Sequence, residues 1–178
     1  LKPLLSEVDC VGLDYDDRAV ALANHINAGA LFQVRDITKD PCGKYDVVTA
    51  IEVLEHIPPE EFSLFVKSLG QLVASRGTLL ITVPHVNQGM AAKHYRHFRI
   101  DEIAVLLSTE LPDFEVCEAY GFGVRNWLER MNKALLQTKN FFLEIASLNR
   151  LRMKLQFNAL PLRDDKAQQV FVRLRRLS

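Results

Sequence analysis

Apolar runs and helical stripes alternate along this chain, and their order predicts its secondary structure. Short runs of apolar and β-branched residues, each followed by polar residues, are typical of buried strands. These runs fall at residues 9–13, 30–34, 46–50, 77–83, 114–120 and 169–174. Apolar residues spaced three and four apart are typical of helices that pack one face on a core. These stripes fall at residues 16–27, 58–75 and 101–109, the second of them opened by Pro58 and Pro59.

The order of these elements predicts the fold class. Strands that alternate with helices favour an α/β fold with a doubly wound, mostly parallel, Rossmann-like sheet. The run from Gly77 to Val83 is apolar on both faces, as a central strand covered by helices on both sides would be. Ligands bind such sheets beyond the carboxyl ends of the strands. We therefore expect a site near Asp14, Asp36 and Ala50.

Residues 125–158 carry a further helical pattern near the C-terminus. Large apolar residues recur there at near-helical spacing, with arginines and lysines between them, which predicts one or two inserted amphipathic helices. A packed layer over the sheet, a substrate lid, a dimer surface and an interfacial membrane contact all fit this pattern. We favour the packed layer, which is the commonest role of such stripes, and the sequence leaves the oligomeric state open.

Composition narrows the class of protein. The chain has 178 residues, of which 48% are hydrophobic, and this suits a single domain over residues 1–178. Lysine plus arginine balance aspartate plus glutamate at 22 each, so charge gives no support for a nucleic-acid partner. Cys10, Cys42 and Cys117 have no metal-ligand spacing, and we expect buried thiols in a reducing, cytoplasmic setting. No apolar run approaches the roughly 20 residues that span a bilayer.

Asp14 and Asp36 each follow a predicted strand. The carboxylate of Asp14 can accept hydrogen bonds from both hydroxyls of a ribose, and that of Asp36 can accept the exocyclic amine of an adenine. Each also has a structural interpretation. An aspartate after a strand often caps the next helix, although Asp16 or Asp17 can do that here, and Asp36 suits a simple turn.

The order of several motifs resembles class I S-adenosylmethionine-dependent methyltransferases, especially the group that contains the ubiquinone-pathway O-methyltransferases. The resemblance covers residues 1–120. The matching motifs are Val-Gly-Leu-Asp-Tyr-Asp (11–16), Val-Arg-Asp-Ile (34–37), Tyr-Asp-Val-Val-Thr-Ala-Ile-Glu-Val-Leu-Glu-His-Ile (45–57), Gly-Thr-Leu-Leu-Ile-Thr-Val-Pro (77–84) and His-Tyr-Arg-His-Phe (94–98). The last motif is similar to a loop that is frequent in members acting on glycans or lipid-linked substrates.

The resemblance implies S-adenosylmethionine as methyl donor and S-adenosylhomocysteine as product. Position by position, it implies that Asp14 binds the ribose and that Tyr15 packs against the adenine. It implies that Asp36 and Ile37 hold the adenine edge. One departure is that the family's first strand and its Gly-x-Gly turn are absent from this sequence, so that two strands would expose unpaired edges. We expect the natural polypeptide to extend N-terminally.

The resemblance also implies that Ile51 and Glu52 lie near the methionine part of the cofactor. Glu52, Glu55 and His56 have a spacing that lets all three converge on one helical turn. Small-RNA 2′-O-methyltransferases and some ubiquinone-pathway enzymes place a divalent metal on a similar pattern. The same letters occur in members that need no metal, so a metal stays possible but is not favoured.

His94 and His97 are the candidate catalytic residues. Methyl transfer from a sulfonium is an in-line displacement, in which the protein aligns the acceptor and takes up its proton. A histidine suits this proton transfer because its unperturbed pKa lies near neutrality. The alternative is that this loop is solvated surface or packs against the next helix.

The sequence thus predicts an S-adenosylmethionine-dependent methyltransferase that acts on a small-molecule, glycan or lipid-linked acceptor, at oxygen. The acceptor itself depends on variable loops and is not predicted. A catalytically silent binding module of the same fold is the alternative. A nicotinamide-dependent oxidoreductase also needs an acid after its second strand, but it does not call for the Glu-Val-Leu-Glu-His segment.

Overall fold

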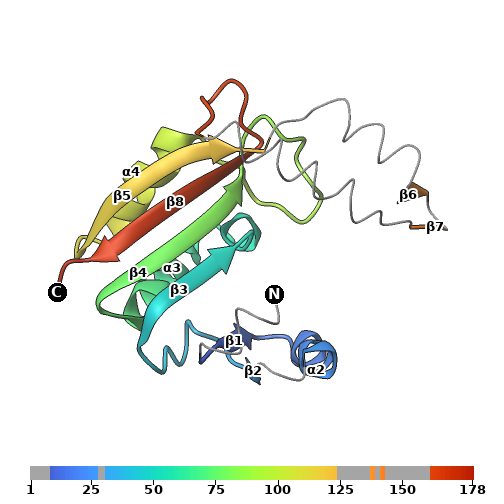
Figure 1. The fold of residues 1–178 in the computed structure, drawn as a ribbon, viewed down its shortest axis with the longest axis vertical. Helices are drawn as coiled ribbons and strands as arrows, with labels where there is room; N and C mark the ends of the chain where they lie inside the picture. Colours follow the sequence, from blue (N-terminus) through green and yellow to red (C-terminus); the bar gives the residue numbers. More distant parts are fainter. Residues whose placement is uncertain (1–8, 28–30, 124–136, 139–140, 143–160) are drawn as a thin grey trace.

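The computed structural model describes residues 9–27, 31–123, 137–138, 141–142 and 161–178, and in these residues the strands form two main sheets and one short two-stranded pair (Figure 1). The smaller sheet consists of β1 (Val11–Asp14) and β2 (Leu31–Val34), which run parallel. The helix α2 (Asp17–Ile26) lies between them in the sequence and packs against both strands. This part confirms the predicted order of strand, helix and strand.

The larger sheet has four strands in the order β3-β4-β8-β5. Their bounds are Tyr45–Ile51 for β3, Val73–Pro84 for β4, Gln169–Arg176 for β8 and Phe114–Phe122 for β5. β3 runs parallel to β4, whereas β8 is antiparallel to both of its neighbours. This sheet is therefore mixed and not mostly parallel as predicted, because the C-terminal strand inserts between β4 and β5 in the reverse direction.

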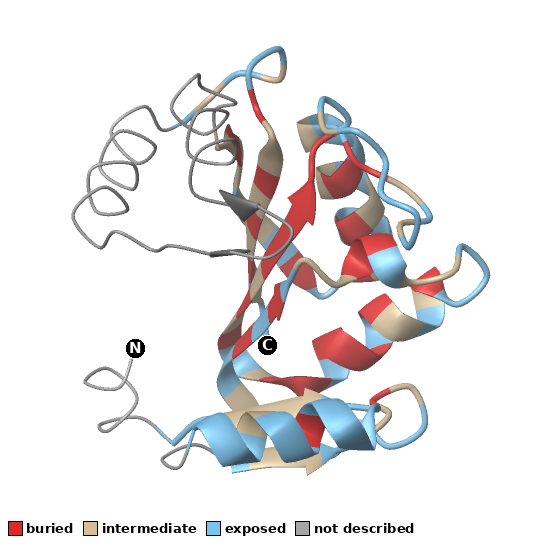
Figure 2. Cartoon of the chain, turned by 90° about the vertical axis from the view of Figure 1, so that its right-hand side faces the viewer, coloured by how far each residue is buried: buried red, intermediate tan, exposed pale blue. Residues whose placement is uncertain are grey.

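The helices α3 (Phe62–Leu72) and α4 (Ile100–Glu110) cover one face of the four-stranded sheet (Figure 2). A short 3₁₀ helix, η1 (Leu54–His56), follows β3. Pro58 and Pro59 lie before α3 rather than inside it, and Val73 already begins β4. The predicted helix over 58–75 was thus too long at both ends, because an apolar period alone does not locate the cap or the first strand residue.

The core lies between this sheet and the two helices. Alternate side chains of β4 and β8 are fully buried there, and they are Leu79, Ile81, Val83, Val170, Val172 and Leu174. Phe98, Ile103 and Leu107 from the α4 side are also fully buried. The central position predicted for residues 77–83 is confirmed, since β4 has a hydrogen-bonded strand on each side. Of the described helices, however, α3 and α4 cover one face only (Figure 2), and β8 runs antiparallel to β4.

The two sheets are separate in the described residues, where β1 and β3 each pair on one side only. Val47 and Ile51 of β3 are more than half exposed. Ile37, just after β2, belongs to the core cluster of the larger sheet, and Leu13 of β1 packs against that cluster. Side-chain packing therefore joins the smaller sheet to the larger one.

The prediction that the three cysteines are buried was wrong. Cys10 and Cys42 are exposed and Cys117 is partly exposed, all three as free thiols. Cys10 and Cys42 lie outside strands and helices, where little packs over them. Most of residues 125–158, where helices were predicted, lies outside the described residues. The described part of this range consists of two short strands, β6 (Gln137–Thr138) and β7 (Phe141–Phe142), which pair antiparallel. Within the described residues no helix has the length and apolar character that crossing a bilayer requires.

Candidate active site

Asp14 ends β1 and is exposed. Its Oδ1 accepts a hydrogen bond from the backbone N–H of Asp16 at 2.9 Å. The N-cap of α2 is Asp16, whose Oδ1 accepts from the N–H groups of Arg18 at 2.9 Å and Ala19 at 3.4 Å. Asp14 is therefore free of the capping role that was the structural alternative for it, and its carboxylate stays accessible at the strand end.

Asp36 lies on the same edge of the smaller sheet as Asp14. The ladder sets Asp14 opposite Val34, shortly before Asp36. Asp36 Oδ1 accepts hydrogen bonds from the Thr38 hydroxyl at 2.6 Å and from the Thr38 N–H at 3.0 Å, and its Oδ2 pairs with Lys39 at 2.9 Å. The bonds from Thr38, followed by the pair with Lys39, lower the pKa of Asp36 to about 2. Asp36 is thus firmly ionised and stabilises its own turn.

Three apolar side chains differ in what they offer a ligand at this edge. The Tyr15 ring is 81% exposed and Ile51, at the end of β3, is 55% exposed, so both present surface to solvent. Ile37 is buried in the core. Its side chain therefore offers no surface to a ligand.

Glu52 follows β3 in a left-handed backbone conformation, with φ 54°. Its N–H donates to the Thr82 carbonyl at 3.0 Å, and its Oε1 accepts from the Thr82 hydroxyl at 3.0 Å. Both bonds direct Glu52 toward the end of β4. The predicted convergence of Glu52 with Glu55 and His56 was therefore wrong, because the chain turns at Glu52 before the 3₁₀ helix begins.

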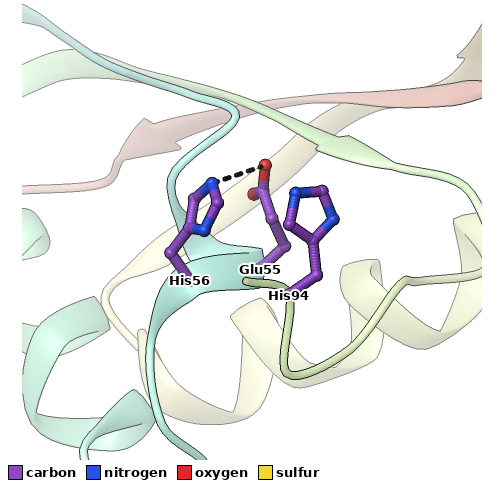
Figure 3. Close-up of side chains that lie close together, drawn as sticks. All are labelled: Glu55, His56 and His94. Carbon is purple, nitrogen blue, oxygen red and sulfur yellow. Dashed lines mark ion pairs between the residues drawn. The ribbon is translucent and has the colours of Figure 1, made fainter. Parts of the chain in front are cut away.

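Glu55, His56 and His94 form a cluster instead (Figure 3). One ligand atom from each residue can be chosen so that all three lie within 4.8 Å of one another. His56 Nε2 lies 3.7 Å from Glu55 Oε1, and the rings of His56 and His94 are nearly perpendicular, with centroids 4.7 Å apart. The backbone N–H of Tyr95 donates to the Glu55 carbonyl at 2.8 Å, so the loop that carries His94 is bonded directly to η1.

His97 is buried beside this cluster, with 7% of its surface exposed. Its Nε2 and the Nδ1 of His94 share a hydrogen bond of 2.8 Å. Burial, followed by the nearby charges of His56 and His97, lowers the pKa of His94. The two candidate catalytic histidines are thus brought together, and His97 contacts His94 rather than open solvent.

Glu55 is the most buried charged group of the site, at 1% exposed. Its Oε2 has no hydrogen-bond partner among the described residues. Desolvation is the largest influence on its pKa and raises it, and the neighbouring charge of Glu52 acts in the same direction. A buried carboxylate oxygen without a partner is costly, so this atom calls for a cation or a proton donor.

Two anchoring residues near the site were missed by sequence reasoning. His85 is fully buried after β4, and its Nε2 bonds Asp164 Oδ1 at 2.9 Å. Arg96 lies over the rings of Phe62 and Phe98, at 3.9 and 4.6 Å from their centroids. The contacts of His85 with Asp164 and of Arg96 with Phe62 join segments that are far apart in the sequence. His85 and Arg96 lie in a polar stretch, which gives no local signal of such a role.

Comparison with known proteins agrees with this architecture. The pattern of a family described as "Methyltransferase domain" matches residues 2–162 of the chain. No curated protein matches. Solved structures with a similar fold include a SAM-dependent methyltransferase from Archaeoglobus fulgidus, with a TM-score of 0.64 and 12% identity over 98% of this chain and 80% of that one.

Two further structures show how widely the fold is used. Magnesium protoporphyrin IX methyltransferase from Synechocystis, solved with bound SAM, has a TM-score of 0.53 and 18% identity over 98% of this chain and 62% of its own. The [4+2]-cyclase SpnF has a TM-score of 0.58 and 12% identity over 95% of this chain and 67% of its own. At such identities the likeness shows the fold, which hosts more than one reaction.

Proposed function

The chain belongs to the methyltransferase domain family, and from this premise we propose that it transfers a methyl group from S-adenosylmethionine to a small-molecule, glycan or lipid-linked acceptor, at oxygen. The observation that carries the proposal is the pair of carboxylates, Asp14 and Asp36, at the carboxyl ends of two adjacent parallel strands. In open α/β sheets this is the edge at which nucleosides bind.

The residues at this edge fit the adenosine part of the cofactor. Asp14 is exposed, uses Oδ1 within its own turn, and is not the cap of α2. It is therefore suited to accept hydrogen bonds from the two ribose hydroxyls. The exposed ring of Tyr15 supplies a flat apolar surface for the adenine. Asp36 Oδ2 is bound by the exposed side chain of Lys39. The exocyclic amine of the adenine would take the place of Lys39 at this oxygen, while Thr38 keeps its bonds to Oδ1.

Ile51 and Glu52 fit the methionine part. They lie where β3 ends, and the exposed side chain of Ile51 offers an apolar contact there. Glu52 is held by two hydrogen bonds to Thr82, so its carboxylate has a fixed direction from which to attract the amino group of the cofactor. S-adenosylmethionine supplies the methyl group as a sulfonium, and the protein's work is to align the acceptor with it.

We propose that the acceptor loses its proton at the histidine cluster. His94 lies at the surface of this cluster, and His97 is buried behind it. The bond between them uses His94 Nδ1, which leaves Nε2 as the atom that meets a ligand. His94 and His97 are thus the catalytic pair, with His97 orienting His94.

Calorimetric titration of the chain with S-adenosylhomocysteine tests the cofactor proposal. Each hydrogen bond to a charged group is worth about 1.5–3 kcal/mol, so Asp14→Asn should weaken binding by roughly 10- to 100-fold. Asp17→Asn is the matched control, because Asp17 lies in the first turn of α2 and is exposed. Equal affinity in the wild type and in Asp14→Asn contradicts the proposal, as does tighter binding of a nicotinamide dinucleotide.

Transfer of a labelled methyl group to pooled small hydroxylated acceptors, glycans and lipid-linked sugars tests the reaction. His94→Gln should lower turnover far more than it lowers cofactor affinity, since His94 acts on the acceptor. Cofactor binding with no transfer to any acceptor pool would instead favour a silent binding module of the same fold.

A further inference from the structure

The lone pairs of three side chains converge after β3 without a proton donor between them. His56 Nδ1 lies 3.1 Å from the Lys93 carbonyl. A carbonyl only accepts, so this nitrogen carries the proton and Nε2 is left as a lone pair. That Nε2 faces Glu55 Oε1 at 3.7 Å. Two acceptors that face each other in this way require a proton or a cation between them.

A single proton does not account for the whole cluster. Whether His56 Nε2 or Glu55 Oε1 carried it, that proton would pair the two residues, but Glu55 Oε2 would still be buried and without a partner among the described residues. The Nε2 of His94 would also remain without a role, because its Nδ1 is already bonded to His97. A cation in contact with Glu55, His56 and His94 satisfies all three groups at once.

We propose that Glu55, His56 and His94 bind a divalent transition-metal cation of the zinc class. The chemistry of the three ligands selects this class. Two imidazole nitrogens and one carboxylate suit zinc, cobalt or iron, whereas magnesium and calcium prefer sites made of oxygen ligands. Glu52 takes no part, because its carboxylate is held by Thr82.

The spacing of the ligand atoms fits this ion. A tetrahedral zinc with bonds of about 2.0–2.2 Å holds its ligand atoms roughly 3.4 Å apart. The 3.7 Å between His56 Nε2 and Glu55 Oε1 is close to this value. The third atom lies within 4.8 Å, so closing the site requires a shift of about 1 Å, which small rotations of the exposed His56 and the partly exposed His94 provide.

The residues behind the ligands are arranged to hold them. The Lys93 carbonyl fixes His56 through Nδ1, and His97 fixes His94 in the same way. Partners of this kind set the tautomer and direction of a metal-binding histidine. The bond from the Tyr95 N–H to the Glu55 carbonyl joins the two segments that supply the ligands.

Three protein ligands leave an open position on the ion. With an ion bound, His94 Nε2 would be a metal ligand in place of the base proposed above, and the ion would supply a Lewis acid that lowers the pKa of an acceptor hydroxyl. This last role rests on the proposed methyl transfer, whereas binding of the metal does not.

Titration of chelator-treated, dialysed protein with Co²⁺ tests the site without any cofactor, and Zn²⁺ should displace the bound Co²⁺. We expect one ion per chain, with the visible absorption of low-coordinate Co²⁺. Glu55→Gln and His94→Gln should weaken binding by at least about 100-fold, and His97→Gln by roughly 10- to 100-fold. His25→Gln is the matched control, since His25 is exposed on α2, and it should titrate as the wild type does.

Thermal unfolding separates loss of the site from loss of the fold. Without metal, Glu55→Gln should unfold at a higher temperature than the wild type, because it removes a buried charge that lacks a partner. Zn²⁺ should raise the unfolding temperature of the wild type but not that of Glu55→Gln. The proposal is overturned if the wild type binds neither ion, if Mg²⁺ displaces Co²⁺ more readily than Zn²⁺ does, or if Glu55→Gln binds as the wild type does. Such a failure leaves the calorimetric test of cofactor binding unaffected.

Discussion

Replacement of Asp164 should loosen the segment that carries the histidine cluster, although Asp164 is far from it in the sequence. Asp164 Oδ1 accepts hydrogen bonds from His85 Nε2 at 2.9 Å and from the Ile100 N–H at 3.3 Å, and Oδ2 pairs with Arg99 at 3.1 Å. His85 Nδ1 accepts from the Asn87 N–H, which leaves the ring proton on Nε2. Asp164 is therefore the partner that this buried imidazole requires.

The cost of Asp164→Ala follows from these contacts. A buried donor left without a partner costs about 1–3 kcal/mol, and His85 is fully buried. The exposed pair with Arg99 adds at most about 1 kcal/mol. We therefore expect a loss of about 1–4 kcal/mol in the free energy of unfolding. In a chain of this size that lowers the unfolding midpoint by roughly 2–16 °C.

Thermal unfolding followed by circular dichroism at neutral pH measures this loss. Asp164→Asn keeps an acceptor for His85 and should lose at most half as much stability as Asp164→Ala. Asp165→Ala is the matched control, because Asp165 is the exposed neighbour of Asp164. The reasoning is refuted if Asp164→Ala costs no more than Asp165→Ala, or if the asparagine variant is as unstable as the alanine variant.

Two further predictions test the neighbouring parts of the site. The pKa of Asp36 is lowered from 3.8 to about 2, so the stabilising effect of its carboxylate is present above pH 3.8 and is lost as the pH falls toward 2. When unfolding is measured across this pH range, Asp36→Asn should be less stable than the wild type at neutral pH and equal to it near pH 2. A difference in stability that does not narrow toward pH 2 would contradict this prediction. Thr82→Val removes the hydroxyl that donates a hydrogen bond to the Glu52 carboxylate. Calorimetry should then show that S-adenosylhomocysteine binds more weakly by about 1 kcal/mol, or roughly fivefold. Unchanged affinity would contradict the role proposed for Glu52 in binding the cofactor.

The sequence determined the local elements and their order. Apolar alternation located β4 and β8, and helical spacing located α2 and α4, because both patterns arise from neighbours along the chain. The same reasoning predicted Asp14 and Asp36 at the ends of successive strands, where the structure has them. Their role in binding a cofactor remains a prediction. Boundaries were less certain, as the early end of α3 shows.

Only the tertiary structure decided which polar side chains meet. The spacing allowed Glu52 to converge with Glu55 and His56, but a left-handed turn and the bonds to Thr82 direct the Glu52 side chain toward the end of β4. His94 takes that place, since the Tyr95 N–H bonds the Glu55 carbonyl across a long loop. The insertion of β8 between β4 and β5 also had no local signal. Such contacts depend on how buried surfaces pack over long sequence distances, and residue spacing along the chain carries no record of that packing.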